Sequence, residues 1–167
     1  MAIDYVQETS TVVERFARRG RLFVVSKRWE GVASGASVDF IISNPSNSGR
    51  ELCLLMLQIM GTDQGWIDMY ADSEGLGSGT TLTPVNKFIG HSETSVAHIE
   101  VDGTYTPGTQ IHATVLPGGS GIFATGGGAE LGVGGIIGEG HNLHVRLTNK
   151  SSSASDLSIR VVWWEKD

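Results

Sequence analysis

Polar and apolar residues alternate with a period of two along much of the chain, most clearly near its end. The stretches 140–149 and 156–165 both show this alternation, and a serine-rich turn separates them. Successive side chains of a β-strand point to opposite faces, so the pattern predicts two strands that each bury one face. The second strand carries Trp163 and Trp164, and it must therefore present indole on both faces of its sheet.

The same alternation, broken by turn-forming residues, predicts strands through the rest of the chain after Gly20. The predicted strands are residues 22–28, 36–43, 51–60, 66–70, 85–89, 95–101 and 110–116. Residues 51–60 are apolar on both faces and predict a covered central strand, and the last two stretches predict a hairpin. About eight strands with no helical pattern between them predict an all-β fold, an antiparallel two-sheet sandwich with jelly-roll wiring.

Residues 1–20 form a separate segment, so we expect an N-terminal arm or short helix followed by a single β-sandwich domain over residues 21–167. Thr11 and Glu14 match a capping box, and Phe16 lies on the apolar side of the helix that would follow. Two interpretations are equally favoured. The helix packs over one end of the sandwich, or the segment grips a neighbouring subunit through residues such as Phe16, Arg18 and Arg19.

Length and cysteine content indicate a domain that folds without a disulfide or a metal. A chain of 167 residues buries enough surface for one stable core. Its single Cys53 lies in an apolar run, which predicts a buried small hydrophobic residue. The first residues do not resemble a secretory signal, and no apolar run approaches the roughly 20 residues of a membrane span. We therefore expect a protein made and kept in solution, with no membrane partner.

Charge is unevenly distributed along the chain. The net charge is −6, yet residues 1–28 contain six basic and three acidic residues, which makes that segment net positive. The remaining residues are strongly acidic, and an acidic surface repels phosphate backbones. Nucleic acid is therefore not an expected partner of the main domain.

The longest irregular stretch lies between Pro117 and Gly140 and is rich in glycine. Loops of this length in a compact domain are usually functional or disordered. Residues 119–124 match the loosest dinucleotide pattern, but more glycine follows instead of a helix, so nucleotide binding is not predicted. Apolar side chains on such a loop are better buried against a partner or around a symmetry axis. The candidates are Ile122, Phe123, Leu131 and Val133.

Histidines and carboxylates provide only weak metal-site candidates. His98 and Glu100 share a strand face, and His112 would lie across the predicted hairpin, but a solvated polar face is favoured over a carboxylate–imidazole site. His141 and His144 are three apart, a spacing that places strand residues on opposite faces. The acidic residues Asp68, Asp72 and Glu74 lack the spacing of a calcium loop. We predict no metal and no cofactor.

Catalytic motifs are not recognisable in the sequence, and we do not expect an enzyme. The chain contains no nucleophile elbow and no zinc-protease helix motif. Exposed aromatic residues on a sandwich face can stack on sugar rings, which makes a carbohydrate- or receptor-binding module the main alternative. Burial in the core or at a subunit interface is favoured for these side chains: Trp29, Trp66, Tyr70 and Tyr105.

Several stretches resemble small β-sandwich proteins encoded among the structural genes of tailed bacterial viruses, which decorate the head or form part of the virion surface. The resemblance rests on residues 38–49, 79–86, 140–149 and 161–165, and it covers roughly residues 32–165. Its motifs are patterns of strand and turn without catalytic content. Proteins of this kind typically form trimers at local threefold positions of a capsid.

The resemblance implies a non-enzymatic capsid decoration or cement protein that binds the major capsid protein as a homo-oligomer, with a trimer favoured. Such a protein is made in the host cytoplasm and resides on the virion head surface; a virion fibre head is the binding-module alternative. Trp164 is the strongest interface candidate, because its outward indole has no evident partner in a monomer. The full predicted interface comprises Phe16, Arg18, Arg19, Ile122, Phe123, Leu131, Val133 and Trp164.

Overall fold

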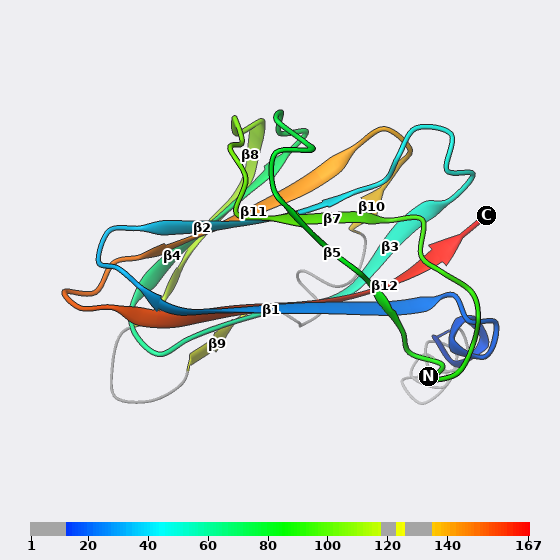
Figure 1. Ribbon diagram of the computed structural model, residues 1–167, viewed down its shortest axis with the longest axis horizontal. Helices are drawn as coiled ribbons and strands as arrows, with labels where there is room; N and C mark the ends of the chain where they lie inside the picture. The colour runs from blue at the N-terminus through cyan, green and yellow to red at the C-terminus, as the bar shows by residue number, and fades with distance from the viewer. Residues whose placement is uncertain (1–12, 118–122, 126–134) are drawn as a thin grey trace, which may run out of the picture.

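The computed structural model describes residues 13–117, 123–125 and 135–167, with only the backbone described for residues 123–125. Twelve strands form two facing layers (Figure 1). They are β1 (Leu22–Val32), β2 (Ser37–Ser43), β3 (Glu51–Gly61), β4 (Gly65–Ala71), β5 (Thr80–Leu82), β6 (Val85–Asn86), β7 (His98–Val101), β8 (Thr109–Leu116), β9 (Phe123–Thr125), β10 (Ile136–Ile137), β11 (Asn142–Asn149) and β12 (Ser155–Lys166).

The two sheets are antiparallel and confirm the predicted sandwich. Sheet A has the order β10-β3-β12-β1-β6, with β9 also paired to β3, and sheet B has the order β5-β7-β2-β11-β4-β8. Strands β1 to β4 alternate between the sheets, as do β8 to β12 when β9 and β10 are taken as one edge. The first and last long strands are therefore neighbours: β12 lies next to β1 in sheet A, and β11 lies next to β2 in sheet B. This wiring is that of a jelly roll.

The core lies between the sheets and is built from the apolar side of the predicted alternation. Leu157, Ile159, Val161 and Trp163 of β12 are each no more than 1% exposed, and they face residues of sheet B such as Val145. The inward orientation of Trp163 and the central position of β3 are both confirmed, since β3 lies between β12 and the β9–β10 edge.

The predicted hairpin of residues 95–101 and 110–116 is wrong. β7 pairs with β2 and β5, whereas β8 pairs with β4 at the opposite edge of sheet B. The connection between them crosses the outer face of the sheet, where Glu74 and Thr106 exchange two backbone hydrogen bonds of 3.0 and 3.1 Å. A connection of this length can close a hairpin or cross a sheet, and the pattern within each strand does not distinguish the two.

Short strands account for the other differences. β5, β9 and β10 have only 2 or 3 residues each and were not predicted, because alternation over so few positions carries no signal. The stretch predicted as a strand over residues 85–89 forms only β6, after which Phe88, Ile89 and Gly90 continue as a loop.

A short helix, residues 13–18, lies beside the end of β12 (Figure 1). An i,i+4 ion pair joins Glu14 and Arg18 on its exposed side, at 2.6 Å. The chain enters β1 through Gly20, whose positive φ of 68° suits a glycine after a helix. None of the helical residues that the structure describes forms a segment long and apolar enough to cross a membrane.

Candidate interaction surface and buried polar clusters

Trp164 has a partner within its own chain, which corrects the expectation that a monomer leaves it unpaired. The ring of Phe16, from the helix, stacks on the Trp164 indole with centroids 5.8 Å apart and an interplanar angle of 22°. Phe16 and Trp164 were both predicted as interface residues, and the structure brings them together. The helix therefore packs on the sandwich, as one of the two interpretations proposed.

The outer face of sheet A is apolar over two complete cross-strand rows. In the first row Leu22 lies opposite Trp164, Trp164 opposite Cys53, and Cys53 opposite Ile136. Two residues of this row are covered, since Leu22 and Cys53 are 5% and 6% exposed. Cys53 is thus buried as predicted, and burial raises the pKa of its thiol.

The second row contains Val85, Val24, Val162 and Met56. Val162 faces outward opposite Val24 and Met56, but it is only 3% exposed. One face of an antiparallel sandwich sheet commonly meets water and is then polar. Two apolar rows on the outer face of sheet A therefore differ from the polar face expected of a sheet that meets water.

The exposed side chains lie at the two margins of this face, and sequence reasoning missed them. Ile136 at one margin is 57% exposed and Val85 at the other is 59% exposed. Beyond Val85, the loop carries Phe88 and Ile89, which are 46% and 91% exposed. The sequence signal for these two exposed residues was their position directly before Gly90, which favours a turn. The prediction assigned them to a strand instead. We call Val85, Phe88, Ile89 and Ile136, with Phe16 and Trp164, the sheet A surface.

The remaining predicted interface residues do not all fall in the described part of the chain. Arg18 pairs with Glu14, and Arg19 is exposed just before β1. Phe123 lies in β9 and is described only by its backbone, which pairs with Gly61 of β3. Ile122, Leu131 and Val133 lie outside the described residues.

Three residues on the outer face of sheet B form a serine–histidine–aspartate array. The Nε2 of His144 lies 2.7 Å from Oδ1 of Asp39, and its Nδ1 lies 2.9 Å from Oγ of Ser73. Tyr70 and Tyr105 pack against the imidazole, with ring centroids 5.4 and 5.5 Å away. Sequence reasoning assigned His144 to an exposed face, but its side chain is fully buried.

This array resembles a catalytic triad in composition but not in access. A nucleophilic serine must reach a substrate carbonyl, with donors placed for the oxyanion. Ser73 is only 3% exposed, and its Oγ also accepts a hydrogen bond of 3.0 Å from the N–H of Gly108. These contacts tie the loops after β4 and before β8 to sheet B. The array therefore acts as a buried polar cluster that holds two loops.

Glu100 organises a second polar cluster on the same face, so His98 and Glu100 do not form the solvated polar face that was expected. Its side chain is 1% exposed and accepts hydrogen bonds from the N–H groups of Gly77 and Gly79, at 2.7 and 3.3 Å. The Nε2 of His98 lies 2.6 Å from Oε1 of Glu100. Burial, together with the charge of Glu100, raises the pKa of Tyr105 to about 12. His112 lies on β8, far from this cluster along the sheet order.

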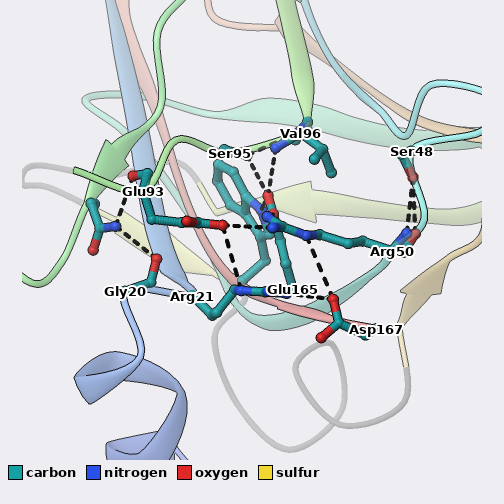
Figure 2. A network of polar contacts seen from close by, with 12 residues as sticks. Gly20, Arg21, Ser48, Arg50, Glu93, Ser95, Val96, Glu165 and Asp167 are labelled. Carbon is teal, nitrogen blue, oxygen red and sulfur yellow. Dashed lines mark hydrogen bonds and ion pairs between the residues drawn. The ribbon is translucent and has the colours of Figure 1, made fainter. Parts of the chain in front are cut away.

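A third cluster joins the ends of β12, β3 and β1 to the loop before β7 (Figure 2). The Glu165 carboxylate is fully buried and accepts from Arg50 at 2.8 Å, from the Ser95 hydroxyl at 2.5 Å and from the Val96 N–H at 3.0 Å. Arg50 also donates to Glu93, at 2.5 Å. These contacts fix the loop that carries Phe88 and Ile89 against the end of sheet A.

The carboxylates in these clusters should make the stability of the fold sensitive to acid. Burial alone raises the pKa of Asp39 and of Glu100, but the hydrogen bonds that each accepts outweigh it and lower both values. The hydrogen bond from Arg50 lowers the pKa of Glu93. Groups with lowered folded pKa values contribute stability above their unfolded pKa and lose it as pH falls through the folded value.

We therefore expect the free energy of unfolding to fall as the pH drops below the ordinary values of 4.5 for Glu and 3.8 for Asp. Urea denaturation at a series of pH values between about 7 and 3 measures it. Asp39→Asn removes one contributing group and should flatten the curve. Unchanged stability of the wild type across the acid range would contradict the assignment.

A cavity of about 600 Å³ opens between the β3–β10 and β4–β8 edges. Its lining is mainly apolar, with the Asp72–His141 pair at its rim, 3.0 Å apart. Asp68 of β4, another carboxylate considered for calcium, accepts a hydrogen bond from Gln110. No group of three potential metal ligands occurs in the described ranges.

Comparison with known proteins identifies no relative. No protein-family model matches the chain, and no curated protein matches its sequence. The geometry of the sheet A surface and of the buried clusters is therefore the basis for any functional conclusion.

Proposed function

We propose that this protein is a non-enzymatic structural component of a virion, a head decoration or cement protein that binds the major capsid protein as a homo-oligomer. The observation that carries the proposal is the sheet A surface. Each of its apolar rows has one strongly exposed end, at Ile136 and at Val85, and the loop after β6 adds Ile89, which is 91% exposed. Contiguous exposed apolar side chains on a folded domain mark protein contact sites.

The charge around this surface suits a protein shell. Arg15, Arg18 and Arg19 are exposed on and after the helix, and Lys87 is exposed beside Phe88. An apolar centre with a charged rim is the usual composition of a specific interface, and basic residues at the rim steer the protein towards an acidic partner. These basic residues thus adjoin two members of the sheet A surface, Phe16 on the helix and Phe88 in the loop.

The rigidity of the surface also fits a mechanical role. The Arg50 and Glu165 contacts hold the Phe88–Ile89 loop, and Asn86 donates to the carbonyl oxygens of Gly20 and Glu93, at 2.7 and 3.0 Å. A preorganised surface loses little entropy on binding. Many such copies on one shell reinforce it through multivalent contacts without any chemical turnover.

Replacement of the most exposed apolar residue tests the proposal. We expect Ile89→Asp to reduce addition to bare head shells, assembled from the major capsid protein of the same virus, by at least about tenfold. The reason is that a charge would be desolvated at the contact. Co-sedimentation with the shells measures the bound fraction.

Leu76→Asp is the matched control, since Leu76 is also exposed but lies in the loop after β4, over sheet B. It should add to shells as the wild type does. Wild-type protein that fails to bind shells contradicts the proposed function.

A carbohydrate- or receptor-binding module is the second candidate, favoured by one observation. Trp66 is 50% exposed beside a groove of about 530 Å³ that Val115 and Lys150 also line. The Lys150 ammonium lies 3.7 Å from the centroid of the indole and so occupies one face that a sugar ring would use. A glycan-array signal that Trp66→Ala abolishes would favour this function over capsid binding.

A further inference from the structure

The four sheet edges of the described sandwich differ in length. An edge strand exposes a row of unpaired backbone N–H and C=O groups, which another strand can bind. On its β6 side β1 is paired only at Phe23 and Val24 and has no partner strand over residues 25–32 within the described ranges, but Lys27, Arg28 and Glu30 place charges on that stretch. Three edges end in short strands: β5 has 3 residues, β6 has 2, and β9 and β10, which share one edge, have 3 and 2. The fourth is β8, with 8 residues, and in the described part of the chain it pairs only with β4.

Of the features that keep natural sheet edges from pairing, β8 has one, a bulge at Ile111, and it lacks charged residues and proline. Its eight residues include no Lys, Arg, Asp, Glu or Pro. Its ladder with β4 shifts between Met69 and Tyr70 but is regular from His112 to Leu116. Val115 is 60% exposed there, and its cross-strand neighbour Trp66 is 50% exposed. Within the described ranges, this regular and uncharged stretch of β8 has no strand on its outer side and can accept one.

We propose that a second copy of this chain pairs its own β8 with this edge, antiparallel, so that sheet B continues across two copies. The inference rests on the proposed function, because it names the surface through which the oligomer forms. A strand that pairs with its own copy in the antiparallel sense generates an isologous two-fold interface. The unit is therefore a dimer, in contrast to the trimer that the sequence resemblance implies.

The flanking charges favour a second copy as the occupant. Lys150 lies over Trp66, near the C-terminal end of β8, whereas Asp68 accepts from Gln110 near its N-terminal end. Antiparallel pairing directs the Lys150 end of one copy towards the Asp68 end of the other, and parallel pairing would place like ends together. Complementary charges fix the register of an interface more than its affinity.

A charge on the edge tests the inference. In sedimentation equilibrium we expect the wild type to dimerise below about 100 µM, and Val115→Lys to raise the dimer dissociation constant at least about tenfold. Thr81→Lys places the same charge on β5, the opposite edge of sheet B, and should leave the constant unchanged. Thermal unfolding confirms that each variant folds. If Val115→Lys lowers the melting temperature, Ala113→Lys, also at an exposed position of β8, replaces it.

Hydrogen exchange locates the contact. The amides of residues 112–116 should exchange more slowly at high protein concentration than at low concentration. A monomer at about 100 µM, a trimer, or a dimer whose β8 exchange does not depend on concentration would overturn the inference. Shell addition is scored separately. A dimer that does not add to head shells contradicts only the proposed function, and a shell-binding protein without β8 pairing contradicts only this inference.

Discussion

Arg50→Met should lower the free energy of unfolding by about 3–5 kcal/mol. The substitution removes the cation that faces the fully buried Glu165 carboxylate, at 2.8 Å, and leaves that charge without its ionic partner. It also releases Glu93, which Arg50 binds on its other side. Removal of one partner of a buried ion pair costs much more stability than replacement of both partners by apolar residues, because the remaining charge stays buried without a counter-charge. Urea denaturation with light-scattering control for aggregation measures the change.

The matched control is Arg28→Met. Arg28 pairs with Glu30 at 2.6 Å, but both side chains are largely exposed, at 71% and 67%. Exposed pairs contribute about 0–1 kcal/mol, so this variant should remain close to the wild type. The double variant Arg50→Met/Glu165→Met should recover part of the loss. Recovery is incomplete because Ser95 and the Val96 N–H lose their acceptor. Equal, small effects of Arg50→Met and Arg28→Met would contradict the assignment of a stabilising buried cluster.

The second large effect is expected at the adjacent tryptophans. Trp163→Ala should cost about 3–5 kcal/mol of folding free energy, since the indole is fully buried between the sheets and stacks on Phe23 at 6.0 Å. Trp164→Ala should cost about 1–2 kcal/mol, because its indole is half-buried and loses mainly the Phe16 contact. The same denaturation series measures both.

Comparison of these two variants also distinguishes an effect on folding from an effect on assembly. Trp164→Ala at a temperature where it remains folded should reduce addition to head shells, because Trp164 and Phe16 belong to the sheet A surface. A Trp164→Ala variant that unfolds as readily as Trp163→Ala would show that both indoles serve the core. In that case Trp164 would no longer indicate an interface.

The sequence predicted the faces of the longer strands well, and the reason is local. Alternation in β11 assigned Leu143, Val145 and Leu147 to the core, where each is at most 8% exposed. It also assigned His144 to the outer face, which is correct for the orientation and wrong for the exposure. The loops after β4 and before β8 cover that face. Ser73, which binds His144 from the first of these loops, is 71 positions away from it in the sequence.

The candidate site was less predictable because it depends on segments distant in sequence. Phe16 and Trp164 were each identified, but only the fold places the helix against the end of β12. Ile89, the most exposed apolar residue of the surface, was assigned to a strand since it follows Val85 in an apolar pattern. The loop forms instead because the backbone of Lys87 binds Leu22 and the chain then turns at Gly90.

The sequence by itself determined the all-β character, the course of the longer strands and the inward set of side chains, because these follow from a period of two that each strand carries alone. The tertiary structure decided which strands pair, where Glu165, Glu100 and His144 are buried, and which edge and face stay open. Those properties arise from contacts between residues far apart in the chain, where pairing depends on the packing of the whole sandwich. The apolar sheet A surface and the long β8 edge are accordingly visible only in the folded molecule.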